Sequence, residues 1–180
     1  MAGGTVIPEG PLVTATRISL LLVLALTVQI AVASRIEVFG VQGDLMLLVA
    51  VAAGLAAGPD RGAIVGFAAG ITFDLLLQSP FGLSALTYAL VAYVAGSLQD
   101  SVLRAAWWIP VATAAAASAL GVILYGVFGT VVGEDLLDLP LLRIALVAGL
   151  LNALVAPALL PIVRWAITPS GGMRPRTMAR

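Results

Sequence analysis

Six long apolar runs, separated by short polar breaks, limit the folds that this sequence can adopt. The runs cover residues 12–33, 41–57, 62–77, 82–98, 108–132 and 141–167. An α-helix needs about 20 apolar residues to cross a bilayer, and even the shorter runs come near that length. Only 10% of the residues are charged, too few to cover a soluble domain. The pattern predicts an all-α integral membrane protein with six transmembrane helices in a compact bundle.

The six runs form one expected domain, residues 12–167. Residues 1–11 contain two prolines and several glycines, and we expect a disordered cytoplasmic N-terminus. Residues 168–180 carry three arginines with further proline and glycine, and we expect a basic, disordered cytoplasmic tail. An alternative with five helices folds the second and third runs into a re-entrant pair.

The arginines indicate the orientation, because positive charge accumulates on the cytoplasmic side of a membrane protein. With six crossings, one side carries seven arginines: Arg17, Arg61, Arg104, Arg164, Arg174, Arg176 and Arg180. The other side carries two arginines and five acids: Arg35, Arg143, Glu37, Asp44, Glu134, Asp135 and Asp138. We therefore expect a multi-pass protein with both termini in the cytoplasm.

Cysteine and histidine are both absent from the sequence. Their absence excludes disulfides, thiol nucleophiles and metal sites built from Cys or His. It also excludes a hydrolase that uses a Ser–His pair. We expect no enzymatic activity, no cofactor, no metal and no nucleic-acid partner.

A ladder of glycines leads to a carboxylate in the third run, "RGAIVGFAAGITFD". Gly62, Gly66, Gly70 and Asp74 recur every four residues, so they share one face of a helix. Glycines in such a row allow another backbone to approach closely in lipid. The carboxylate is different, because a buried charge within the hydrocarbon is costly unless it is paired, protonated or hydrated.

Three roles for Asp74 remain open: a structural lock, recognition of a partner protein, and a coupling or substrate group of a transporter. The residue lies about 18 Å along the helix from its cytoplasmic end. Candidate partners at that depth are Arg143, Tyr88, Thr87 and Gln78. Our working hypothesis is that the glycines make room for a neighbouring helix, and that Asp74 fixes the register of that contact.

Other polar residues in the runs have simpler interpretations. Asn152 and Gln29 are expected to form hydrogen bonds between helices. Pro157 and Pro161 are expected to kink the last helix. Arg143 is expected to extend to solvent or to pair with an acid of the preceding loop, Asp135 or Asp138. The tryptophans fit anchoring at the membrane interface: Trp107, Trp108 and Trp165.

The segment 44–93 resembles the MreD family of rod shape-determining proteins. The family pattern has an Asp-Leu pair, a short loop, a Gly-x3-Gly-x3-Asp-Leu element, and then a turn that leads to Ala-Leu and Val-Ala-Tyr. Here the matching residues are Asp44-Leu45, Pro59-Asp60-Arg61, Gly66, Gly70, Asp74-Leu75, Gly82, Ala85-Leu86 and Val91-Ala92-Tyr93. Asn152 with Pro157 resembles the last helix of the family. Gly43 stands where a proline is expected.

The resemblance implies a non-catalytic scaffold of the elongasome in the bacterial cytoplasmic (inner) membrane. Such a scaffold supports cell shape and lateral peptidoglycan synthesis. The implied partners are a MreC-like bitopic protein, MreB and the RodA/penicillin-binding-protein synthase, besides membrane lipid. The expected helix-packing and partner-binding residues are Gly62, Gly66, Gly70, Asp74, Tyr88 and Asn152.

The resemblance also implies a fold similar to the substrate-binding S-components of vitamin transporters. An S-component-like subunit that binds a vitamin or another small molecule is therefore the alternative function. The short segment "QSPFG" (78–82) argues against it, because five residues are too few to cover a vitamin. A small enzyme of lipid metabolism is a weaker alternative, since the sequence offers no site for it.

Overall fold

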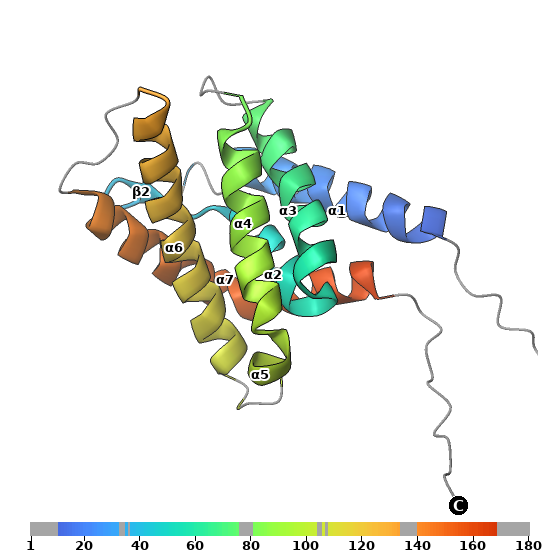
Figure 1. The fold of residues 1–180 in the computed structure, drawn as a ribbon. Helices are drawn as coiled ribbons and strands as arrows, with labels where there is room; N and C mark the ends of the chain where they lie inside the picture. Colours follow the sequence, from blue (N-terminus) through green and yellow to red (C-terminus); the bar gives the residue numbers. More distant parts are fainter. Residues whose placement is uncertain are drawn as a thin grey trace, which may run out of the picture.

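The computed structural model describes residues 11–32, 35, 37–75, 81–103, 106, 108–133 and 140–168. The described residues form seven helices and one short hairpin (Figure 1). The elements are α1 (Pro11–Ala31), β1 (Glu37–Val38), β2 (Val41–Gln42), α2 (Leu45–Ala57), α3 (Pro59–Asp74), α4 (Leu83–Ser97), α5 (Gln99–Leu103), α6 (Ile109–Val131) and α7 (Pro140–Ile167). Apart from Pro11 and Thr168, the expected disordered ends lie outside the described residues.

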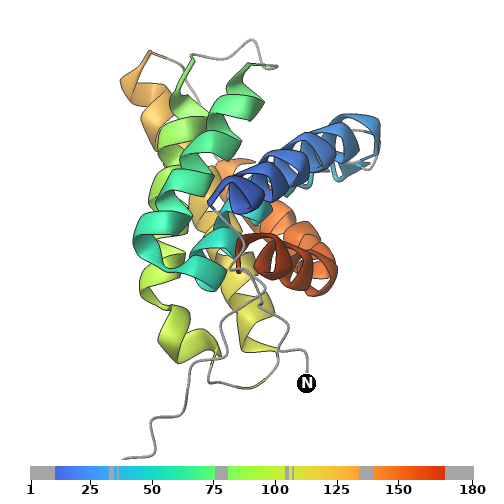
Figure 2. The same ribbon diagram turned by 90° about the vertical axis from the view of Figure 1, so that its right-hand side faces the viewer.

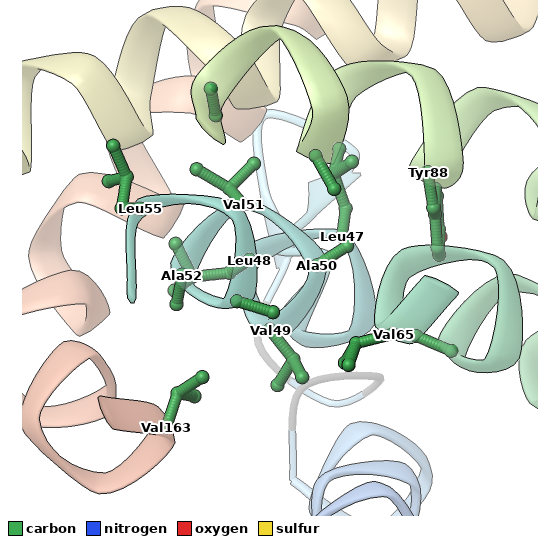
Figure 3. Close-up of a cluster of buried hydrophobic side chains, with 14 of the residues drawn as sticks. Leu47, Leu48, Val49, Ala50, Val51, Ala52, Leu55, Val65, Tyr88 and Val163 are labelled. Atoms are coloured by element: carbon green, nitrogen blue, oxygen red, sulfur yellow. The ribbon is translucent and has the colours of Figure 1, made fainter. Parts of the chain in front are cut away.

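The short helix α2 forms the centre of the bundle. It contacts α1, α3, α4, α6 and α7, and the ten residues from Met46 to Leu55 are all buried. Figure 3 shows Leu47 and Val51 pointing to one side of α2 and Val49 pointing to the opposite side, so that both sides of the helix face the core. A helix that is apolar on all sides is stable only when other elements surround it, and α2 meets that condition.

The first turn of α2 begins later than the apolar pattern predicts. Val41 and Gln42 pair with Val38 and Glu37 in an antiparallel hairpin, so they are not helical. Phe39 and Gly40 form the two-residue turn with φ values of 54° and 76°, the combination typical of a type I′ hairpin. The helix therefore starts at Leu45, and the expected helix over 41–57 was four residues too long at its beginning.

Within the described residues, three helices are long and apolar enough to cross a membrane: α1, α6 and α7. The helices α2 and α4 are apolar but have only 13 and 15 residues, so they are about 20 Å and 23 Å long. The hydrocarbon core of a bilayer is about 30 Å thick. The structure thus confirms a mostly helical fold with three helices that could span a membrane; it does not confirm the expected six, nor the expected similarity to transporter S-components.

The helices α3 and α4 form an antiparallel pair that lies beside α2, and the two views show them next to each other (Figures 1 and 2). Helix α6 packs on α7 and on α4. This arrangement places the glycines of α3 against α4 and brings polar side chains of α1, α4, α6 and α7 together at the start of α2. The contact between the glycines of α3 and α4, together with the start of α2, defines the candidate site.

Candidate functional site

The helix α3 presents a face without side chains, which we call the glycine face; it consists of Gly62, Gly66 and Gly70. A Cβ atom at Gly66 would lie 2.6 Å from the carbonyl oxygen of Tyr88. A Cβ atom at Gly70 would lie 2.3 Å from the Cα of Ala85. Both neighbours are backbone atoms of α4, so α3 and α4 are in direct backbone contact, the packing mode that small residues allow in lipid.

The other end of the glycine face contacts α2. A Cβ atom at Gly62 would lie 2.4 Å from the Cα of Gly54, and one at Gly54 would lie 2.2 Å from the carbonyl oxygen of Ala92. A Cβ atom at Gly96 of α4 would lie 2.6 Å from the carbonyl carbon of Gly58 and from the nitrogen of Pro59. The backbones of α2, α3 and α4 therefore meet at one place, and glycine is required on each helix there.

Asp74 ends α3 and binds the first turn of α4. The residue is buried, with 3% of its surface exposed. Oδ2 accepts hydrogen bonds from the amides of Gly82 (2.9 Å) and Ala85 (3.3 Å), and Oδ1 accepts one from the amide of Ser84 (3.2 Å). The first amides of a helix have no partner within the helix. A carboxylate at this position satisfies them and is also favoured by the helix dipole.

The contacts of Asp74 correct our expectation of its partners. The expected side chains have other contacts: Tyr88 donates to Asp44, Thr87 Oγ1 donates to the Leu83 carbonyl (2.8 Å), and the Arg143 guanidinium lies 5.5 Å from the Phe39 ring centroid. Gln78 lies outside the described residues, as do Asp135 and Asp138, the expected partners of Arg143. The actual partners are main-chain amides, which no residue pattern reveals.

A second cluster of buried polar side chains surrounds the start of α2, and we call it the polar node; it consists of Gln29, Asp44, Tyr88, Ser118 and Asn152. Asp44 caps α2, since Oδ1 accepts from the amide of Leu47 (2.9 Å) and Oδ2 accepts from the Tyr88 hydroxyl. Gln29 of α1 donates to the Gly43 carbonyl (3.0 Å) and accepts from the Leu45 amide (2.8 Å). Helices α1 and α4 are thereby fixed to the start of α2.

Asn152 of α7 completes the polar node from the opposite side. Its Oδ1 accepts from the Asp44 amide (3.1 Å), and its Nδ2 donates to the Asp44 carbonyl (3.0 Å) and to Ser118 Oγ of α6 (3.0 Å). Asn152 is 1% exposed and Ser118 is 0% exposed. The polar node therefore joins α1, α4, α6 and α7 to one point on the chain. Buried polar groups that are fully paired in this way specify a unique arrangement of helices.

A pocket of about 390 Å³ adjoins the polar node between α2, α4, α6 and α7. Its polar lining comes from Gln42, Asp44, Tyr88 and Tyr125, and Phe73 covers part of the wall. The Phe73 and Tyr88 rings are stacked with centroids 6.1 Å apart. Among the described residues, no group of three Asp, Glu, His or Cys side chains is arranged to hold a metal ion. The pocket offers hydrogen-bonding groups on an aromatic wall.

A comparison with the models of protein families matches the helices that form this site. The model of the rod shape-determining protein MreD matches residues 12–166, from the first turn of α1 to the last turn of α7. The chain belongs to the MreD family. No curated protein and no solved structure shows significant similarity to it. The resemblance that we drew from the sequence is thus confirmed over nearly the whole chain.

Membership of the MreD family assigns the chain a role in rod shape determination. The family consists of shape-determining structural proteins of the membrane rather than known enzymes. In this MreD-family chain, the Asp-Leu pair noted in the sequence is the N-cap and first residue of α2. The aspartate of the Gly-x3-Gly-x3-Asp element is the cap of α4.

Sequence reasoning did not assign a role to Asp44 beyond the MreD pattern, nor to Ser118. An aspartate directly before an apolar run is a signal for a helix N-cap, and that signal was available for Asp44. The sequence gives no comparable signal for Ser118, which lies 34 residues before its partner Asn152. Its place in the polar node depends on the packing of α6 against α7.

Replacing Asn152 by leucine is expected to destabilise the protein by about 1–3 kcal/mol, because it leaves the Asp44 amide and the Ser118 hydroxyl without their partner. The Asp44 carbonyl keeps its hydrogen bond from the Leu48 amide. Thermal unfolding in detergent measures the loss. Ser118→Ala removes only one of these hydrogen bonds and should cost less. The double variant should lose less stability than the sum of the two single losses, since each single variant already removes the hydrogen bond between Asn152 and Ser118. Strictly additive losses would show that the two residues act separately.

Proposed function

We propose that this chain is a non-catalytic membrane scaffold of the elongasome, and that it acts by holding a MreC-like bitopic protein. Through that protein it would reach MreB and the RodA/penicillin-binding-protein synthase, and so support lateral peptidoglycan synthesis. One observation supports this above all others: each of three buried polar residues forms hydrogen bonds outside its own helix. Asp74 of α3 binds the first turn of α4, and Tyr88 of α4 and Asn152 of α7 both bind Asp44 at the start of α2. These polar groups hold the helices together.

The exposed faces of α1 and α7 supply the surface that such a scaffold needs. The exposed apolar side chains include Leu20, Val23 and Leu24 of α1 and Leu146, Leu150 and Leu154 of α7. In a membrane these residues contact lipid or a transmembrane helix of another protein. An apolar surface of this kind suits association with a bitopic partner through helix packing.

We further propose six crossings of the inner membrane with both termini in the cytoplasm. The Arg17 guanidinium of α1 lies 4.9 Å from the Trp165 ring centroid of α7, so the beginning of the first helix and the end of the last helix are on the same side. At the other end of α7, Arg143 lies over Phe39 of the hairpin between α1 and α2. The short α2, α3 and α4 would then cross a locally thinned bilayer.

The proposed topology predicts the accessibility of single cysteines, which is easily measured because the chain has no native cysteine. A cysteine at Gly40, in the β1–β2 turn, should react with a membrane-impermeant maleimide in intact spheroplasts. A cysteine at Asp60, in the first turn of α3, should react only after the membrane is permeabilised. Labelling of Asp60→Cys in intact spheroplasts would contradict the topology.

Co-expression with the cognate MreC-like protein tests the scaffold directly. We expect the tagged chain to retain that protein through affinity purification and gel filtration. We also expect it to restore rod shape to cells that lack their own copy. A chain that restores shape but never retains the MreC-like protein would contradict the proposed partner. A chain that does neither would contradict the proposed function.

The polar pocket beside the polar node favours a second candidate function, that of an S-component-like subunit. Its volume of about 390 Å³ and its lining by Asp44, Tyr88 and Tyr125 suit a small ligand with hydrogen-bonding groups. Native mass spectrometry of the purified protein distinguishes the two functions. A small molecule that remains bound and is lost in Tyr125→Ala would favour the second candidate.

A further inference from the structure

A groove at the opposite end of α2 has a different chemistry from the polar pocket. It has a volume of about 350 Å³ and lies between α2, α6 and the last turns of α7. Eight of its nine lining residues are apolar, among them Leu55, Pro110, Pro157 and Pro161, and the ninth is Arg164. We call it the proline groove.

The prolines explain why a groove is present here. Pro157 and Pro161 lie inside α7. Proline has no amide hydrogen to donate, and its ring clashes with the preceding turn of the helix, so α7 is irregular here. The facing residues of α2 include Ala52 and Ala56, whose methyl groups are too small to fill the space. Figure 3 shows Ala52 and Leu55 at the end of α2, next to α6 and α7. The result is an apolar channel with one charged residue.

The charged residue of the proline groove is Arg164, whose side chain is exposed. Within the described residues, no carboxylate pairs with its guanidinium. The opposite wall includes Pro110 and Val111 of the first turn of α6, the positive end of a 23-residue helix. Two tryptophans flank the region, since Trp108 precedes α6 and Trp165 follows Arg164, and they are 55% and 60% exposed. Exposed tryptophans are typical of the headgroup level of a membrane.

We propose that the proline groove binds one anionic phospholipid, with an acyl chain along the apolar walls and the phosphate on Arg164. The apolar lining matches an acyl chain, and the single cation complements a phosphate with a net negative charge. This inference requires only that the chain lies in a membrane; it does not depend on the scaffold function or on any protein partner.

Native mass spectrometry of the full chain in mild detergent tests the proposal, with phosphatidylglycerol and phosphatidylcholine added in equal amounts. We expect phosphatidylglycerol to be retained about fivefold more than phosphatidylcholine, the factor that corresponds to one arginine near an anionic lipid. Arg164→Gln should abolish this preference. The matched control Arg61→Gln removes an exposed arginine of α3 outside the groove, and it should retain the preference.

A second variant tests the apolar part of the groove. Ala56→Leu narrows the channel without changing its charge, and it should lower the retention of both lipids. Gel filtration verifies that each variant is folded. Equal binding of the two lipids by the unaltered chain would overturn the proposal, as would equal losses in Arg164→Gln and Arg61→Gln. A photo-crosslinker at Leu160 that captures a protein rather than lipid in native membranes would also overturn it.

Discussion

Replacing Gly70 by leucine is expected to prevent α3 from packing on α4. A Cβ atom at this position would lie 2.3 Å from the Cα of Ala85 and 2.5 Å from its amide nitrogen. Both are backbone atoms, so no rotation of a side chain can relieve the overlap. We expect a loss of about 3 kcal/mol or more in stability. Fluorescence-detected gel filtration after heating in detergent measures it, and we expect aggregated protein or a much lower melting temperature.

Two alanine substitutions test whether the backbone contact of Gly70 with α4, rather than the size of the leucine side chain, causes the loss of stability. Gly70→Ala adds only the Cβ atom that overlaps α4. Gly126→Ala adds the same atom in α6, where it would meet only the flexible methyl groups of Leu141 at 3.0 Å. Alanine favours a helix over glycine by about 1 kcal/mol. We therefore expect Gly126→Ala to be nearly neutral and Gly70→Ala to destabilise. Equal melting temperatures would contradict the backbone contact.

Replacing Asp74 by leucine is the second change with a large expected effect. It removes the acceptor of three hydrogen bonds and leaves the amides of Gly82, Ser84 and Ala85 without partners. We expect a loss on the order of 2–4 kcal/mol, because buried unpaired amides are costly but hydrogen bonds between membrane helices contribute less than those in isolation. That loss corresponds to a decrease in melting temperature of roughly 5–15 °C.

A matched substitution at an exposed acid controls for the loss of charge. Asp60 lies in the first turn of α3 and is exposed, so Asp60→Leu should lower the melting temperature only slightly. Both variants should still insert into the membrane. We expect Asp74→Leu alone to retain less of the MreC-like protein, because the α3–α4 pair is loosened. Equal melting temperatures for the two variants would show that the cap contributes nothing.

The sequence predicted the long helices well, because hydropathy alone determines them. The expected helices over 108–132 and 141–167 agree within one residue at each end with α6 and α7. The interval of four residues also predicted that Gly62, Gly66 and Gly70 share a face. It did not predict which helix covers that face, since small residues permit any close neighbour.

The hydrogen bonds of the site were less predictable, for two physical reasons. The partners of Asp74 are backbone amides, and every residue except proline has one. In the polar node, Asn152 meets Asp44 across 108 residues, and such a contact depends on how α7 packs on α2. The predicted start of α2 was too early because Val41 and Gln42 are compatible with both a helix and a strand. The two-residue turn before them places them in a strand.

A disulfide between Gly43, just before α2, and Leu151 of α7 tests most directly whether the helices that meet at the polar node stay together while the protein works. A Cβ atom at Gly43 would lie 3.6 Å from the Cβ of Leu151, within the range of about 3.5–4.5 Å that disulfides require. The chain has no other cysteine, so the variant Gly43→Cys/Leu151→Cys can form only this intramolecular bond. Each single variant serves as the control.

We predict that the double variant becomes resistant to maleimide after mild oxidation, and that oxidised cells remain rod-shaped and retain the MreC-like protein. Two thiols that stay fully reactive would contradict the observed contact between Gly43, just before α2, and Leu151 of α7. A disulfide that forms but abolishes rod shape until it is reduced would contradict the fixed joint, because it would show that α2 and α7 must separate for the protein to work.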